Sequence, residues 1–142
     1  MIYLLDTNIW LERMLGQERA AEVAELLTRV PSNQLCITDF TLHSIGVILY
    51  RLKQPQLYVR FVQDVLLDRA TRLLTVPPDA ATELVEVTAK YRLDFDDAYQ
   101  YVAATRHHLT LISLDSDFDR TDNGRQTPAE IVRQLDAEVE NE

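Results

Sequence analysis

The chain has 142 residues, of which 46% are hydrophobic, so it can bury one packed core and is not intrinsically disordered. Its 23 acidic and 14 basic residues give a net charge of −9, which argues against a protein that holds nucleic acid through a broad basic surface. A nucleic-acid enzyme with a bound divalent cation is not excluded, because the ion would reverse the local charge.

The sequence carries no recognisable targeting or disulfide signal. No apolar run is long enough for a transmembrane helix, and the N-terminal "MIYLLDTN" lacks the basic segment of a signal peptide. The single cysteine, Cys36, lies in the apolar run "LCIT" and offers no disulfide framework. We therefore expect a single domain over residues 1–142 that is cytoplasmic and does not associate with a membrane.

Short apolar runs alternate with segments of helical spacing along the chain. From the N-terminus, the pattern predicts a strand at 2–5, helices at 7–15 and 18–30, a strand at 35–38, and helices at 39–52 and 58–70. It continues with a strand at 72–76, helices at 79–91 and 94–108, a strand at 109–113, and a final helix up to 140. Thr127 followed by Pro128 is a strong start signal for that final helix, and Thr7 or Asn8 could cap the first one.

The predicted strands are continuous apolar runs rather than alternating ones. This feature, together with the alternation of strands and helices, is typical of an α/β fold whose parallel sheet is covered on both faces. In such folds ligands bind beyond the carboxyl ends of the strands, where the strand order reverses.

Several aspartates follow directly on the predicted strands. Asp6 follows the first strand, Asp39 the second, and Asp115 and Asp117 the fourth, while Asp97 opens the helix before the fourth strand. Because parallel strands end at one edge of a sheet, we expect these carboxylates to gather there. Oxygen ligands of this kind suit Mg²⁺ or Mn²⁺.

Some of the polar residues have simpler explanations. Asp94 or Asp96 could cap a helix and interact with its positive N-terminus, and Asp39 would also serve as an N-cap. Asp119 lies in a polar loop and is expected to be solvated. His43 lies in the middle of a largely apolar helix, where a hydrogen-bonded core residue is the more common role than a ligand.

Three stretches together resemble the signature sequences of PIN-domain ribonucleases, whose best-known single-domain members are the VapC toxins of bacterial toxin–antitoxin pairs. They are "LLDTNIWLE" at the N-terminus, "DDAYQYVAA" at 96–104 and "LISLDSDF" at 111–118. The resemblance implies a three-layer α/β/α sandwich with a short parallel sheet, an acidic Mg²⁺ or Mn²⁺ site, and endonucleolytic cleavage of RNA by metal-activated water. It also implies an antitoxin protein as partner.

The resemblance also assigns roles to individual residues. By position, Asp6, Asp97 and Asp115 correspond to the metal ligands, and Asp117 to an auxiliary catalytic carboxylate. Asn8 and Ser113 would hydrogen-bond to the ligands.

One position departs from the family pattern. The family carries a Glu on the helix after the second strand, and Ser44 occupies that position in "TDFTLHSIGV". The nearby Asp39 and His43 are uncertain substitutes, because neither lies on the same face of a regular helix as Ser44. With Ser44 in place of the glutamate, the protein is expected to be either a competent nuclease with an altered second metal position or a weakened member of the family that serves another purpose.

Two other classes of protein with acidic residues at strand ends fit the sequence less well. A haloacid-dehalogenase-type phosphatase needs a second Asp two residues after Asp6, where Asn8 stands. A receiver-like domain would need paired acids at the first strand and a Lys after its last strand. The more serious alternative is an inactive PIN fold that acts as a protein-interaction module. Its docking surface or a homodimer interface would involve apolar side chains of residues 40–67, which could equally be ordinary core.

Overall fold

A four-stranded parallel sheet forms the centre of the computed structural model, which describes residues 2–141. Its strands are β1 (Tyr3–Leu5), β2 (Leu35–Thr38), β3 (Arg72–Leu74) and β4 (Thr110–Ile112), in the order β3-β2-β1-β4. All three strand pairs are parallel, which confirms the predicted α/β fold. The strand order reverses between β1 and β4, so a crevice is expected beyond the carboxyl ends of these two strands.

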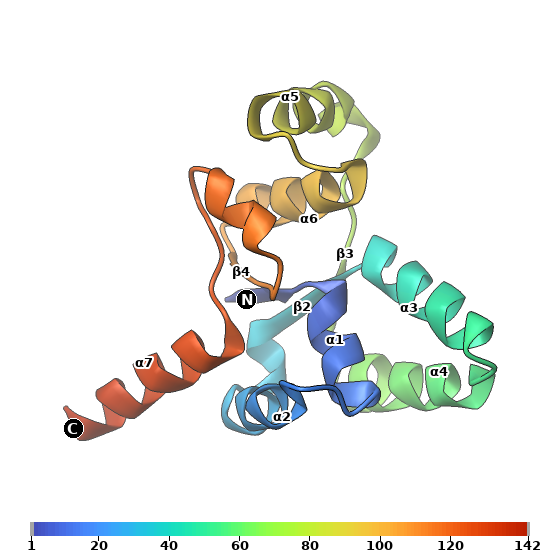
Figure 1. Cartoon of the computed structure of the whole chain (residues 1–142), viewed down its shortest axis with the longest axis vertical. Helices are drawn as coiled ribbons and strands as arrows, with labels where there is room; N and C mark the ends of the chain where they lie inside the picture. Colours follow the sequence, from blue (N-terminus) through green and yellow to red (C-terminus); the bar gives the residue numbers. More distant parts are fainter. Residues whose placement is uncertain (1, 142) are drawn as a thin grey trace.

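The helices cover both faces of this sheet (Figure 1). They are α1 (Thr7–Met14), α2 (Ala20–Arg29), α3 (Asp39–Arg51), α4 (Pro55–Phe61), α5 (Ala81–Tyr91), α6 (Phe95–Arg106) and α7 (Pro128–Glu140). Short 3-10 turns are η1 (Ser32–Gln34), η3 (Pro78–Ala80) and η4 (Ser116–Arg120), and η2 (Val62–Asp68) is a π-helical turn. In the part of the chain that the structure describes, none of the helices has the length and apolar character needed to cross a lipid bilayer.

The core around the sheet consists of two apolar clusters, one on each face of the sheet. Adjacent residues of a strand contribute to different clusters, because successive side chains point to opposite faces. Leu5, Ile37 and Ile112 belong to one apolar cluster, with residues of α1, α2, α3, α4 and α7. Leu4 and Leu111 belong to the other, with residues of α6 and η4. The sheet is thus buried on both sides, as in a three-layer α/β/α sandwich.

Helix α6 lies between the sheet and α5 (Figure 1). Val102 of α6 packs with Leu84 of α5 in a third small cluster, while Ala103 and Ala104 belong to the cluster on the sheet. Since α6 leads into the start of β4, its N-terminus lies at the carboxyl edge of the sheet. Asp97, in the first turn of α6, is therefore brought to the same edge as the ends of β1 and β4.

Some predicted element boundaries need correction. The predicted helix 58–70 begins earlier, because Pro55 occupies its first turn, where a missing N–H costs nothing. The regular α-helix then ends at Phe61 and continues as the π turn η2. The predicted start of the last helix is confirmed, since Thr127 and Glu130 form a reciprocal capping box.

Candidate active site

Asp6 directly follows β1, at the edge of the sheet where β4 also ends, and is almost fully buried, with 6% of its surface exposed. It caps α1 by accepting a hydrogen bond from the Thr7 amide at 2.8 Å, so the expectation that Thr7 or Asn8 is the cap was wrong. Its other donors are Gln100 Nε2 at 3.0 Å, Ser113 Oγ at 2.8 Å and Asn8 Nδ2 at 3.4 Å. Burial nevertheless raises the pKa of Asp6, and these hydrogen bonds only partly offset it.

Ser113 and Asn8 join the end of β1 to the end of β4. The Ser113 hydroxyl donates to Asp6 Oδ2 and accepts from the Asp115 amide at 3.0 Å. Asn8 donates to Ser113 Oγ at 3.2 Å and accepts from the Leu114 amide at 3.2 Å. Both side chains therefore fix the position of Asp6 relative to the segment that carries Asp115.

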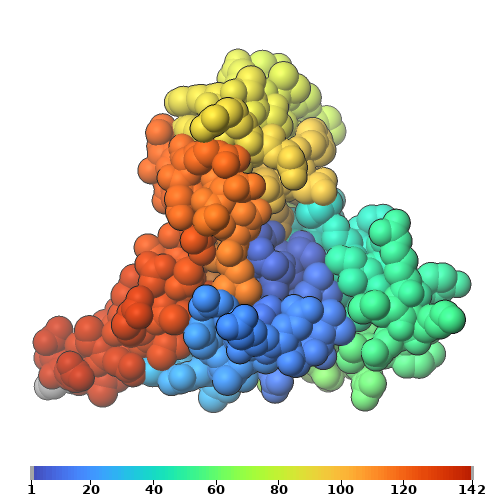
Figure 2. Space-filling view, viewed as in Figure 1, coloured from blue at the N-terminus to red at the C-terminus, as the bar shows by residue number. Residues whose placement is uncertain are grey.

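Three further carboxylates gather above Asp6. Asp97, Asp115 and Asp117 each offer an oxygen atom, and these three atoms lie within 4.8 Å of one another. Asp115 Oδ1 also accepts a hydrogen bond from the Asp117 amide at 2.9 Å, which closes the turn that presents both side chains. Figure 2 shows the blue start of the chain, the orange segment after β4 and the yellow-orange α6 meeting on one face of the molecule.

The pKa of Asp97 is raised to about 7. Burial is the largest cause, followed by the charges of Asp115, Asp6 and Asp94 and by a hydrogen bond shared with Asp115. Asp97 is therefore partly protonated near neutral pH in the metal-free protein. Such a strong perturbation within a group of carboxylates is typical of a functional site.

The carboxylate group fits a hard divalent cation. Oxygen ligands bind Mg²⁺ at about 2.0–2.1 Å and Ca²⁺ at about 2.3–2.6 Å, so two ligands of one ion lie at most about 5 Å apart. The Asp97, Asp115 and Asp117 oxygens lie within 4.8 Å of one another, which is within the limit for Ca²⁺. The ligands of one Mg²⁺ lie at most about 4.2 Å apart, so binding of Mg²⁺ would draw the three side chains slightly closer together. A cation would also remove the mutual repulsion that raises the pKa of Asp97. Asp6 is not one of these three, and its role as a direct ligand stays a prediction.

Sequence reasoning missed Gln100, which stands one helical turn after Asp97 on α6 and is 1% exposed. Its amide nitrogen donates to Asp6 Oδ1 and to Thr41 Oγ1 at 2.8 Å, and its oxygen accepts from Thr38 Oγ1 at 2.6 Å. The network continues from Thr41 to Thr7, whose hydroxyls lie 2.9 Å apart. Gln100 thus ties Asp6 to α3. The signal in the sequence was a single amide within the otherwise apolar stretch "AYQYVAA".

Replacing Gln100 with Met should lower the free energy of unfolding by about 2 kcal/mol, because Thr38 and Asp6 would lose buried hydrogen-bond partners. Gln134→Met is the matched control, since Gln134 is an exposed residue of α7 that bonds only to Gln126. Urea denaturation of both variants measures the difference. Equal stability would mean that the buried amide contributes nothing to holding Asp6.

Arg120 was also missed. Its guanidinium donates to Asp117 Oδ1 at 3.2 Å and to the backbone oxygens of Tyr91 and Arg92 at 3.0 and 2.7 Å. Two backbone contacts hold the cation in place, and it in turn restrains Asp117, whose side chain is 48% exposed. The isolated sequence gives no sign of this contact, because Arg120 and the end of α5 meet only in the fold.

Asp39, His43 and Ser44, the three α3 residues near the position of the family's glutamate, differ in their surroundings. Asp39 accepts from the Tyr99 hydroxyl at 2.6 Å and from the Phe40 amide at 2.9 Å, and Thr38 rather than Asp39 is the N-cap. His43 is exposed, and Ser44 is half-buried. Ser44 follows Thr41 by three residues, so it lies one turn further along the face of α3 that meets the Gln100 network.

A sequence profile of the PIN domain matches residues 3–124. The chain therefore belongs to the PIN domain family, as the three motifs indicated. No curated protein matches the sequence significantly.

Solved structures of toxin–antitoxin proteins share the fold. A toxin–antitoxin complex from Klebsiella pneumoniae is 26% identical, with a TM-score of 0.70 over 89% of this chain and 97% of that one. FitAcB from Neisseria gonorrhoeae is 21% identical, with a TM-score of 0.77 over 90% of this chain and 99% of that one. VapC20 from Mycobacterium tuberculosis, described as a sarcin–ricin loop cleaving toxin, is 18% identical, with a TM-score of 0.71 over 82% of this chain and 92% of that one.

Proposed function

We propose that this protein is a divalent-metal-dependent endoribonuclease. The observation that carries the proposal is the meeting of Asp97, Asp115 and Asp117 above the buried Asp6 at the switch point between β1 and β4. PIN-domain proteins are generally metal-dependent nucleases, and the chain belongs to that family. An inactive interaction module would have no need of carboxylates so crowded that the pKa of Asp97 reaches about 7.

The proposed mechanism is hydrolysis of an RNA phosphodiester by an activated water. A Mg²⁺ or Mn²⁺ ion held by Asp97 and Asp115, with Asp6 or Asp117, would lower the pKa of a bound water and stabilise charge on the phosphate. Asp97 must give up its proton to act as a ligand. Asn8, Ser113 and Gln100 keep Asp6 in place, so the site is preorganised.

Among residues 2–141, the cysteine and histidine side chains that could act as covalent nucleophiles are not part of the carboxylate group. Cys36 is buried in β2, and burial raises the pKa of its thiol. His43 is exposed on α3 and is not a member of the carboxylate group. A direct attack by water therefore suits the site better than a covalent intermediate.

We also propose an antitoxin as the physiological partner, so that the chain is the toxin of a toxin–antitoxin pair. Support comes from the Klebsiella pneumoniae complex, which is described as a toxin–antitoxin assembly and shares 26% identity with this chain.

A homodimer through residues 40–67 stays a proposal as well. Its support is that Tyr50, Leu52, Val59 and Leu67 remain exposed on that segment, although Ile45, Leu49 and Phe61 belong to the core.

Cleavage of RNA by the purified chain tests the nuclease proposal. We expect cutting in Mn²⁺ or Mg²⁺, none in excess chelator, and none by Asp115→Asn. Asp119→Asn is the matched control, because Asp119 is an exposed neighbour that pairs with Arg125 and lies outside the carboxylate group. Cutting that survives in chelator, or that Asp115→Asn retains in full, would show that the activity does not come from this site.

A further inference from the structure

A cavity of about 420 Å³ lies at the amino-terminal edge of the sheet, at the opposite end of the strands from the carboxylates. It opens to solvent and is lined by α1, the end of α2, the turn η1, the start of β2 and the segment from η2 to Thr71. Its apolar walls are Trp10, Leu27, Val30, Pro31, Leu35 and Val65. A volume of this size is within the range of small-molecule sites, roughly 300–1,000 Å³.

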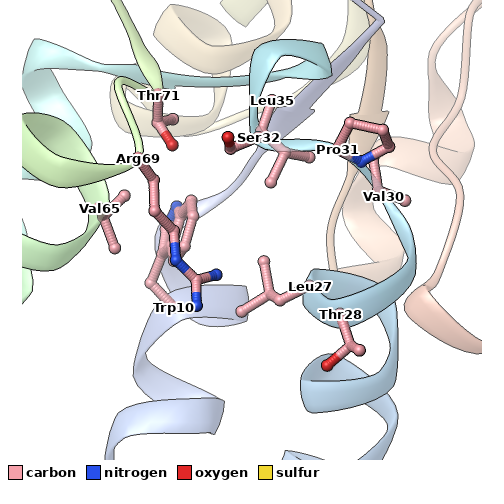
Figure 3. A pocket seen from close by; sticks show the side chains of 10 residues that line it. All are labelled: Trp10, Leu27, Thr28, Val30, Pro31, Ser32, Leu35, Val65, Arg69 and Thr71. Carbon is pink, nitrogen blue, oxygen red and sulfur yellow. The ribbon is translucent and has the colours of Figure 1, made fainter.

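The polar side chains that line the cavity are Arg69, Ser32, Thr71 and Thr28, and the Thr28 hydroxyl already donates to the Ala24 backbone oxygen at 2.9 Å. Figure 3 shows the Arg69 guanidinium extending past the Trp10 ring into the cavity, with the Ser32 and Thr71 hydroxyls at its upper end. Arg69 is an exposed residue at the mouth of the cavity. Within residues 2–141 its side chain has no hydrogen bond or ion pair, and the neighbouring Asp68 bonds instead to Gln63.

The indole N–H of Trp10 also has no acceptor within the described residues. Its nitrogen is completely covered, however, and the ring packs edge-on against Phe61 with centroids 5.5 Å apart. The indole therefore serves as an apolar wall. The groups that can bond to a ligand are the guanidinium of Arg69 and the two hydroxyls.

This combination of groups selects a particular chemistry. A guanidinium presents paired donors that match a carboxylate, and such charge-assisted bonds are stronger than neutral ones. The surrounding leucine, valine and tryptophan side chains favour an apolar body and disfavour a heavily hydrated anion such as free phosphate. The volume accommodates one ring or one branched chain with its acid group.

We propose that this cavity binds a small organic carboxylate with an apolar ring or branched chain, its carboxylate on Arg69 and its body against Trp10 and Leu27. The site is separate from the carboxylate group of the proposed nuclease and does not depend on it. The Arg69 side chain supplies the charge preference, and the apolar walls supply the remaining affinity.

The test compares the binding of 3-phenylpropionate with that of 3-phenylpropionamide, an uncharged analogue of the same size and shape. Trp10 is the only tryptophan of the chain and lines the cavity, so its fluorescence reports binding directly. We expect the acid to bind about tenfold more tightly than the amide, as a hydrogen bond to a charged group would give. Arg69→Gln should abolish this preference and leave weak, equal binding of both compounds.

Arg72→Gln is the matched control, because Arg72 is exposed on β3 and does not line the cavity. Its preference for the acid should equal that of the parent protein. A cavity-filling variant, Ser32→Phe, should lose both compounds while keeping the parent circular dichroism spectrum. Equal binding of acid and amide by the parent would overturn the proposal and indicate a purely apolar surface, such as a contact for a protein chain. Failure of the acid to bind at millimolar concentration would overturn it as well.

Discussion

Asp97→Asn is expected to abolish RNA cleavage and, at the same time, to stabilise the metal-free protein above neutral pH. The two effects have one cause, the crowding that raises the pKa of Asp97 to about 7. In the unfolded chain an aspartate titrates near its ordinary pKa of about 4. Between these values the native state binds the proton more tightly, so the free energy of unfolding of the parent falls as the pH rises, and levels off above about 7.

The asparagine variant has no proton to lose at this position, so its stability should stay higher across the same window. One pKa unit corresponds to about 1.4 kcal/mol. Because Asp97 is only partly buried and solvent screens part of the repulsion, we expect a gain of about 2 kcal/mol near pH 8 and almost none near pH 4. Urea denaturation at several pH values measures this difference.

Asp96→Asn is the control for the loss of one negative charge, since Asp96 is an exposed neighbour on α6 outside the carboxylate group. It should leave both cleavage and the pH dependence of stability nearly unchanged. Mn²⁺ should stabilise the parent and the control but not Asp97→Asn, because only a folded site that holds the ion gains from it. An Asp97→Asn protein that still cuts RNA, or that is no more stable near pH 8, would contradict this account of the site.

The convergence of Asp97 and Asp115 could be predicted from the sequence because topology enforces it. Four apolar runs separated by helical segments predict a parallel sheet, and all parallel strands end at one edge. A residue just after β4 and a residue at the start of the helix that precedes β4 must then lie near each other. The three motifs added the identity of the family, and the match over residues 3–124 confirms it.

The partners of these carboxylates could not be predicted, because they come from side-chain packing between distant segments. Gln100 reaches Thr38 at the end of β2 and Thr41 on α3. A single amide in an apolar stretch marks Gln100 as unusual, but the sequence does not show which distant residues it contacts. Arg120 is similar, since its acceptors include backbone oxygens at the end of α5. Every residue has a backbone oxygen, so the residue types of a sequence do not show which of these oxygens accepts a hydrogen bond from a distant side chain.

Asp6 illustrates a different limit of sequence reasoning. Its position after β1 predicted a place at the site, but not that both oxygens would already accept hydrogen bonds from four donors. A carboxylate so fully bonded is held rigidly and has few free lone pairs. Direct coordination by Asp6 would therefore require one of the longer bonds, such as that from Asn8 at 3.4 Å, to give way.

Ser44→Glu is expected to tighten Mn²⁺ binding and to speed RNA cleavage. The sequence motifs predict that Ser44 stands where the family carries a carboxylate, and it lies one turn beyond Thr41 on the face of α3 that meets Gln100. The nearby Gly46 offers no free space, because a Cβ there would lie 3.3 Å from the Tyr58 ring. The room must come from the half-buried surface around Ser44 itself.

The size of the effect follows from the number of charged oxygen ligands, which sets the affinity for a hard cation. We expect about tenfold tighter binding, equivalent to about 1.4 kcal/mol, measured by calorimetric titration with Mn²⁺. The metal-free variant should lose about 1 kcal/mol of stability, because a further carboxylate joins a group that already repels itself. His43→Glu is the matched control, since it adds the same charge at an exposed neighbouring position on a different face of α3. If Ser44→Glu binds Mn²⁺ no better than His43→Glu, the side chain at position 44 does not reach the carboxylate group, and the family's glutamate has no equivalent on this helix.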